Sequence, residues 1–176
     1  MSLPAKIVEL HEALATADLP HAFGGALALA WCTQRARGTI DIDVNVFVAA
    51  EHTDAVLAAL PATVVATPEQ RGQLLTDGQT RLWWDTTPLD VFLDTTGFHR
   101  AAAGRVCWEQ FGDARLPFLS CGDLAVFKAF FDRTKDWADL EEMRAAGTLD
   151  VEAVAGVLVR YLGGSDPRIE RLRSLV

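Results

Sequence analysis

Apolar and polar positions alternate most clearly between Thr39 and Val48. Every second residue from Ile40 to Val46 is aliphatic, and the positions between them hold Asp41, Asp43 and Asn45. A repeat of two residues that persists over about eight positions predicts a β-strand with one buried face. Both aspartates would then leave the same, opposite face of that strand.

Other strand-like runs precede and follow this segment. The short stretch Pro20–Phe23 is extended and ends at Gly24-Gly25. Short β-branched or alternating runs predict further strands at residues 63–66, 81–84, 89–94, 106–111 and 115–119. The polar segments 85–88 and 112–113 predict that the last four of these strands form two hairpins.

Apolar residues spaced three and four positions apart predict helices on both sides of these strands. The predicted helices cover residues 4–17, 26–32, 51–60, 120–131, 137–146, 151–162 and 167–175. Ser120 followed by Asp123 resembles a capping box, which marks the start of the helical C-terminal part. We therefore expect an α+β fold, with a core domain at residues 1–119 and a helical subdomain at residues 120–176.

Composition limits the classes of protein. The chain has 176 residues, of which 50% are hydrophobic and 23% are charged, and this suits one sizeable core with at most a small annex. The net charge of −8 argues against a protein that coats nucleic acid without specificity. It is compatible with a carboxylate-rich metal site or with a basic partner protein.

No apolar run approaches the roughly 20 residues that a membrane span needs, so no membrane association is expected. The first residues show no secretion signal, which favours a cytoplasmic protein. Cys32, Cys107 and Cys121 lie far apart and lack a metal-ligand spacing. We therefore expect all three to be reduced thiols.

The pair Asp41 and Asp43 suggests metal binding. Two carboxylates on one strand face lie within about 7 Å of each other and repel unless a cation lies between them. Oxygen-only ligands favour Mg²⁺, which usually also keeps water and substrate phosphates as ligands. The alternative is that both aspartates lie on the solvated face of an edge strand.

Gly24-Gly25 stands between a predicted strand and a predicted helix. Glycines there permit close backbone approach and leave amide N–H groups at the helix N-terminus for a phosphate. A plain turn is the alternative. A phosphate seat and a nearby carboxylate pair are together what a nucleoside triphosphate and its metal require.

The run from Gly24 to Ala28, followed by Arg37, Thr39, Asp41 and Asp43, resembles the signature of the DNA polymerase β-like nucleotidyltransferase superfamily. The most similar branch is the small bacterial one, which includes minimal nucleotidyltransferases and abortive-infection toxins. The resemblance implies a nucleotidyltransferase fold with a small mixed β-sheet packed with helices. It also implies that the glycines line the triphosphate and that the two aspartates hold Mg²⁺.

The resemblance further implies a third carboxylate on a later strand. Asp90 and Asp94 are both candidates on the segment 89–94, and Asp90 is preferred because the family's third acid precedes an apolar run. Lys128 lies in a helical segment that is similar to one of the same branch, where a lysine faces the nucleotide. A snorkelling lysine is the alternative for Lys128.

The predicted reaction is Mg²⁺-dependent transfer of a nucleoside monophosphate from a nucleoside triphosphate to an acceptor hydroxyl. Asp41, Asp43 and Asp90 are the predicted catalytic and metal-binding residues. The predicted nucleotide-binding residues are Gly24, Gly25, Arg37, Thr39 and Lys128. The acceptor stays open between tRNA, a protein and a small molecule. The resemblance also suggests a toxin with an antitoxin partner, and an inactive nucleotidyltransferase-fold binding module is the alternative.

Overall fold

The structure is a computed structural model that describes residues 1–175. The chain divides into two compact units. The first contains residues 1–27 and 38–119, and the second contains residues 28–37 and the chain from residue 120 onward. The second unit therefore includes a short segment from the part of the chain that the sequence assigns to the core.

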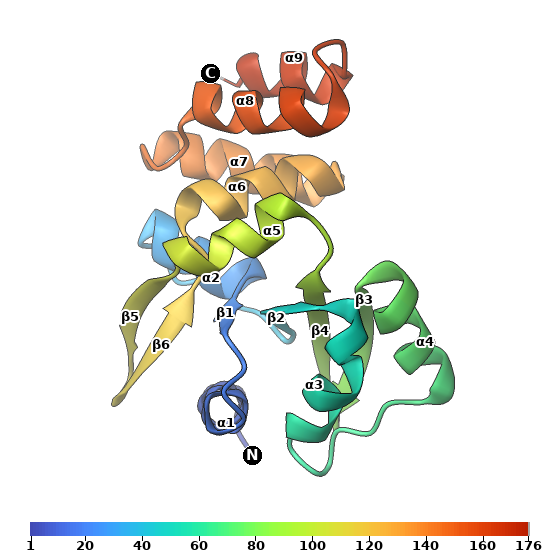
Figure 1. The fold of residues 1–176 in the computed structure, drawn as a ribbon. Coiled ribbons are helices and arrows are strands. Elements are labelled where there is room, and N and C mark those ends of the chain that lie inside the picture. The colour runs from blue at the N-terminus through green and yellow to red at the C-terminus, as the bar shows by residue number, and fades with distance from the viewer. Residues whose placement is uncertain (176) are drawn as a thin grey trace. The chain divides into compact units, whose positions relative to one another are not determined.

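A six-stranded mixed sheet forms the centre of the first unit (Figure 1). Its strands are β1 (His21–Phe23), β2 (Ile42–Ala49), β3 (Gln79–Trp84), β4 (Thr87–Asp94), β5 (Cys107–Phe111) and β6 (Ala114–Phe118). They lie in the order β3-β4-β2-β1-β6-β5. The pairs β2/β4 and β1/β6 are parallel, and the other three neighbouring pairs are antiparallel. Both predicted hairpins are present, as β3–β4 and β5–β6.

Strands β2 and β4 form the buried centre of this sheet. Ile42, Val44 and Val46 are completely buried and lie opposite Leu89, Val91 and Leu93 in register. Burial of each aliphatic side chain contributes about 1.5–3 kcal/mol. Because side chains alternate along a strand, this apolar face directs Asp43 and Asp90 to the opposite face.

The helices of the first unit are α1 (Leu3–Thr16), α3 (Thr53–Ala59), α4 (Pro68–Asp77) and α5 (Gly97–Ala102), with 3-10 turns at Ala50–His52 and Ala103–Arg105. Helix α1 begins at the N-cap Ser2 and buries Ile7, Leu10 and Leu14, as its sequence pattern predicts. Helix α2 (Gly25–Thr33) begins in the first unit and ends in the second. The mixed sheet and its helices confirm the predicted α+β class.

The second unit consists mainly of helices α6 (Cys121–Phe131), α7 (Thr134–Ala145), α8 (Val151–Leu162) and α9 (Pro167–Arg173). Helix α6 packs against α7 and α8, and α8 packs against α9. The Ser120 hydroxyl accepts a hydrogen bond from the Asp123 amide at 3.1 Å, so the predicted helix start is confirmed. No described helix has the length and apolar character required to cross a bilayer.

Two details of the sequence-based prediction were wrong. Residues 63–66 form no strand, because the Val64 amide donates to the Pro61 carbonyl at 2.8 Å in a turn and does not join a ladder. Helices α4 and α5 were not predicted. For α4 the sequence holds a signal, since Thr67 and Gln70 form a capping box around Pro68.

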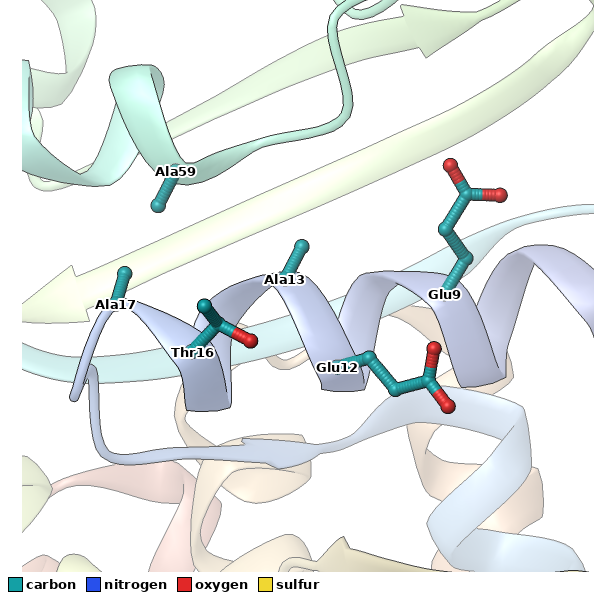
Figure 2. A pocket seen from close by; sticks show the side chains of 6 residues that line it. All are labelled: Glu9, Glu12, Ala13, Thr16, Ala17 and Ala59. Atoms are coloured by element: carbon teal, nitrogen blue, oxygen red, sulfur yellow. The ribbon is translucent and has the colours of Figure 1, made fainter.

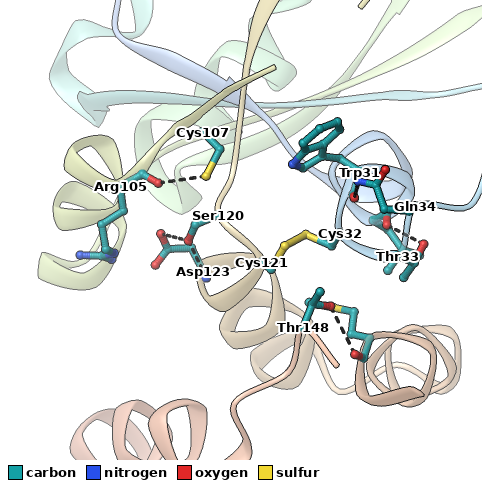
Figure 3. The surroundings of a disulfide bond; sticks show 12 residues. Trp31, Cys32, Thr33, Gln34, Arg105, Cys107, Ser120, Cys121, Asp123 and Thr148 are labelled. Carbon is teal, nitrogen blue, oxygen red and sulfur yellow. Dashed lines mark hydrogen bonds between the residues drawn. A yellow bond between two sulfur atoms is a disulfide. The ribbon is translucent and has the colours of Figure 1, made fainter. Parts of the chain in front are cut away.

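The cysteine prediction was also wrong for two of the three residues. Cys32 near the end of α2 and Cys121 at the start of α6 form a disulfide, with Cα atoms 5.6 Å apart (Figure 3). The two cysteines are separated by 89 positions in the sequence, and only the fold brings them together. Cys107 lies outside this bond, and its thiol donates to the Arg105 carbonyl.

A histidine pair joins α1 to β1. His11 Nδ1 lies 2.9 Å from His21 Nε2, and His21 Nδ1 lies 2.7 Å from the Leu19 carbonyl oxygen. A carbonyl oxygen only accepts, so His21 donates from Nδ1, and a neutral His21 then accepts from His11 through Nε2. Burial lowers the pKa of both rings below its usual value, which favours their neutral forms.

This pair predicts a loss of stability in mild acid. Because the folded-state pKa values are lowered, the unfolded chain binds protons first as the pH falls below about 6.5. The free energy of unfolding should therefore decrease by up to about 1.4 kcal/mol per pH unit for each histidine that stays neutral in the folded state. Chemical denaturation between pH 7.5 and pH 5 measures this slope. His21→Gln should flatten it and His52→Gln, at an exposed position, should not; equal slopes in all three proteins would contradict the assignment.

Candidate functional site

A row of polar side chains crosses the first unit's sheet from β3 to β2. Arg81 on β3 lies opposite Asp90 on β4, and Asp90 lies opposite Asp43 on β2. Residues paired across neighbouring strands project from the same face of a sheet. At the end of this row, the Gly24 amide donates to the Asp43 carbonyl oxygen at 2.9 Å. The row therefore joins the predicted acids to the predicted glycine pair.

The Asp43 carboxylate packs directly against Gly25. Gly25 has a φ of +50°, and a Cβ atom there would overlap the Asp43 carboxylate. A Cβ atom at Gly24 would lie 3.0 Å from the Asn45 side-chain nitrogen. Position 25 therefore requires glycine for close packing against β2, whereas a side chain at position 24 would require a small shift of Asn45. Since the Gly24 amide is bonded to β2, the phosphate-binding amides expected at this turn would be those from Gly25 onward, at the start of α2.

Gly25→Ala is expected to disturb both stability and the site. The left-handed backbone costs a non-glycine residue about 1–2 kcal/mol, and the overlap also forces the Asp43 carboxylate to move. We expect a loss of at least about 2 kcal/mol in the free energy of unfolding, measured by denaturant titration. Gly122→Ala is the matched control, because Gly122 also lies in the first turn of a helix and no atom lies within 4 Å of its added Cβ. Equal effects of the two substitutions would contradict the packing argument.

Asp41 lies one residue before β2 and is oriented by Thr39. The Thr39 hydroxyl donates to Asp41 Oδ1, and the Asp41 amide donates to the same hydroxyl at 3.4 Å. Asp41 Oδ2 lies 4.0 Å from Arg81 Nη2. Thr39, predicted to bind nucleotide, therefore contacts the carboxylate that it would position.

Arg81 makes the most extensive contacts in this cluster. Its Nε and Nη2 donate to the two oxygens of Asp90 at 2.7 and 2.6 Å. The hydrogen bond with Asp90 raises the pKa of Arg81, and the charges of Asp90, Asp41 and Asp43 raise it further. One guanidinium thus balances only part of the charge of three carboxylates.

The two candidates for the third acid occupy different surroundings. Asp90 lies in the row beside Asp43, whereas Asp94 lies at the far end of β4 opposite Ala49. Asp94 Oδ2 accepts a hydrogen bond from Arg100 Nε at 2.7 Å, and its side chain is 3% exposed. The geometry therefore favours Asp90, and its role in binding metal stays a prediction.

The donor set of this cluster is compatible with Mg²⁺. Asp41, Asp43 and Asp90 offer carboxylate oxygens, and the neighbouring turn has no side chain at Gly24 or Gly25 that would exclude a phosphate. Within residues 1–175, no three histidine, cysteine or acidic side chains are already arranged around a metal position. At Asp90, both carboxylate oxygens accept hydrogen bonds from Arg81.

Arg37 and Lys128, two of the predicted nucleotide-binding residues, both bond to the Asp139 carboxylate in the second unit. Lys128 Nζ donates to Asp139 Oδ2 at 2.5 Å and lies 3.8 Å from Asp136 Oδ1. Arg37 Nη1 donates to Asp139 Oδ1, and this bond raises the pKa of Arg37. The Lys128 side chain is 8% exposed, so its ammonium is buried in an ion pair and does not reach bulk water. Nucleotide binding by Arg37 and Lys128 stays a prediction.

The tryptophans of β3 face opposite sides of the sheet. Trp84 is 2% exposed and belongs to the core, whereas Trp83 is 52% exposed. Trp83 projects from the same face as Arg81, two positions away along the strand. It is therefore an aromatic surface beside the carboxylate row.

A separate depression lies between α1 and α3 (Figure 2). It is lined by Glu9, Glu12, Ala13, Thr16, Ala17 and Ala59. None of the predicted site residues lines it. Its two glutamates would repel a triphosphate, so we do not assign the nucleotide to it.

No family model and no curated protein matches the sequence. Solved structures of nucleotidyltransferase-type proteins do match the fold. A solution structure of the antibiotic-resistance factor ANT(2'')-Ia superposes with a TM-score of 0.62 at 16% identity, over 90% of this chain and 92% of that one. The crystal structure of ANT(2'')-Ia with adenylyl-2''-tobramycin gives 0.57 at 14% identity, over 99% and 98%. The lincomycin-bound lincosamide adenylyltransferase LnuA gives 0.54 at 13% identity, over 81% and 96%. The chain therefore has the nucleotidyltransferase fold.

Proposed function

We propose that this chain is a Mg²⁺-dependent nucleotidyltransferase that transfers a nucleoside monophosphate from a nucleoside triphosphate to an acceptor hydroxyl. One observation carries the proposal: the Asp43 carboxylate lies beside both Asp90 and the side-chain-free turn at Gly25. Acidic ligands and a phosphate seat are thus adjacent within one unit of the fold. The similarity to solved nucleotidyltransferases supports the general reaction.

Different groups of the site have different proposed roles in the reaction. Asp41, Asp43 and Asp90 would hold Mg²⁺, which when bound would neutralise phosphate charge and favour an in-line displacement. The amides at the start of α2 would bind the β- and γ-phosphates. The acceptor oxygen forms a bond to the α-phosphorus, the bond from that phosphorus to the bridging oxygen breaks, and pyrophosphate leaves. Asp90 would receive the proton of the acceptor hydroxyl.

We propose a small molecule as the acceptor. Two of the similar solved proteins are described with antibiotics, tobramycin in ANT(2'')-Ia and lincomycin in LnuA. Both similarities extend over most of the chain, at 81% for LnuA and 99% for ANT(2'')-Ia. The test described below also offers tRNA and protein as acceptors. The toxin role, the antitoxin partner and a cytoplasmic location stay predictions from the sequence.

The test is label transfer from each α-³²P nucleoside triphosphate in the presence of Mg²⁺. Tobramycin, lincomycin, total tRNA and cell protein are offered as separate acceptors. We expect labelled product with one of the antibiotics, and no transfer by Asp41→Ala or Asp43→Ala. Transfer to tRNA or protein alone would overturn the acceptor class. Transfer that survives both substitutions would refute the site.

A second candidate is a catalytically inactive binding module of the same fold. The observation in its favour is that both Asp90 oxygens are bonded to Arg81. Such a module would bind ATP without releasing pyrophosphate. Calorimetric ATP binding, measured together with pyrophosphate release, separates this candidate from the enzyme.

A further inference from the structure

Arg81 supplies the positive charge within the carboxylate cluster. It donates two hydrogen bonds to Asp90, lies 4.0 Å from Asp41 and interacts electrostatically with Asp43. Three carboxylates this close would otherwise repel one another. In this arrangement, Arg81 supplies the charge that a divalent cation would supply.

A divalent cation and this guanidinium would compete for Asp90. Mg²⁺ binds carboxylate oxygens at about 2.1 Å. Both Asp90 oxygens already lie 2.6–2.7 Å from guanidinium nitrogens, so a bound ion would approach a like charge closely. Repulsion between the two positive charges therefore weakens metal binding at Asp90 while Arg81 stays paired with it.

Arg81 is the group that is free to move. Its side chain is 52% exposed, whereas that of Asp90 is 16% exposed. Strand β3 lies at the edge of the sheet and pairs only with β4 in the described order. The guanidinium can therefore turn toward solvent without displacing core side chains.

We propose that Arg81 is an internal counterion that competes with the divalent cation for Asp90, so that the metal binds more tightly once Arg81 has released this carboxylate. This inference rests on the proposed function, because it takes the same carboxylates as metal ligands. It assigns Arg81 a positioning role: the residue holds Asp90 in place until the metal arrives. It also makes the Arg81–Asp90 pair compatible with an active enzyme.

The experiment measures Mn²⁺ binding to the nucleotide-free protein by titration calorimetry and electron paramagnetic resonance. Each charge-assisted hydrogen bond contributes substantially to the free energy of the Arg81–Asp90 pair. Removal of both bonds should therefore change the affinity for Mn²⁺ by a factor of ten or more. We therefore expect Arg81→Gln to bind Mn²⁺ at least about tenfold more tightly than the wild type. Arg81→Lys keeps the charge without the bidentate geometry, so its affinity for Mn²⁺ should lie between those of Arg81→Gln and the wild type.

Arg71→Gln is the matched control. Arg71 bonds both oxygens of Asp54 at 2.6 and 2.7 Å, so it has the same geometry away from the cluster. The Arg71→Gln substitution should leave the affinity for Mn²⁺ unchanged. Equal or weaker Mn²⁺ binding by Arg81→Gln would overturn the competition while leaving the metal site intact. Absence of Mn²⁺ binding in every protein would overturn the proposed function as well, so the two failures are distinguishable.

Discussion

Asp43→Asn is expected to lower the rate of nucleotidyl transfer by at least about 10³-fold while the protein stays folded. Asparagine keeps the shape of the side chain beside Gly25 but removes the charge that would hold the metal. Repulsion from Asp90 is removed together with the attraction to Arg81, so the change in stability should be small. Single-turnover kinetics with the identified acceptor and a thermal unfolding scan measure the two effects.

Asp90→Asn and Asp94→Asn are the companions to this substitution. The former should lower the rate by a similar factor because Asp90 lies in the same row. The latter should leave the rate near that of the wild type, since Asp94 is paired with Arg100. Normal activity of Asp43→Asn would refute the site. A large loss of rate in Asp94→Asn with little loss in Asp90→Asn would instead make Asp94 the third acid.

Removal of the Cys32–Cys121 disulfide is expected to cost about 3–4 kcal/mol of stability. The bond closes a loop between residues 89 positions apart, so its loss releases much conformational entropy in the unfolded chain. For a chain of this size, the unfolding temperature should fall by about 10 °C. Thermal unfolding of Cys32→Ser, and of the wild type treated with a reductant, measures the loss.

Cys107→Ser is the control for the disulfide, because Cys107 lies outside it. This substitution should change the unfolding temperature little. Thiol titration in denaturant offers an independent check, since the chain has three cysteines and the disulfide removes two of them from reaction. Three reactive thiols in the protein as purified, or equal unfolding temperatures for Cys32→Ser and Cys107→Ser, would contradict the assignment.

Much of the fold was predictable because its signals are local. The alternation along β2 fixes which side chains are buried, and Ser120 marks the start of α6 within four residues. The disulfide depends on contacts between distant parts of the chain, and spacing along the sequence carries no information on it. The four residues at 63–66 have a strand-like composition, yet the Val64 amide donates to the Pro61 carbonyl in a turn and not to a neighbouring strand.

The candidate site was predictable to the extent that its residues are close in sequence or follow a known motif. Asp43 and the glycine pair do lie together, and Trp83 and Trp84 do face opposite ways. The importance of Arg81 was missed because the predicted turn held residues 85–88. The turn in the structure holds only two residues between Trp84 and Thr87, and this register sets Arg81 opposite Asp90. Asp139 was missed because only the packing of α6 against α7 brings it to Lys128.

The close approach of Asp43 to Gly25 has a consequence for the history of this fold. Any side chain at position 25 would occupy the space that the carboxylate at position 43 needs. The two positions are therefore expected to covary among homologous sequences, with a larger residue at position 25 accompanied by a shifted or shorter side chain at position 43. Homologues that keep an acid in the place of Asp43 should hold glycine or another small residue at position 25.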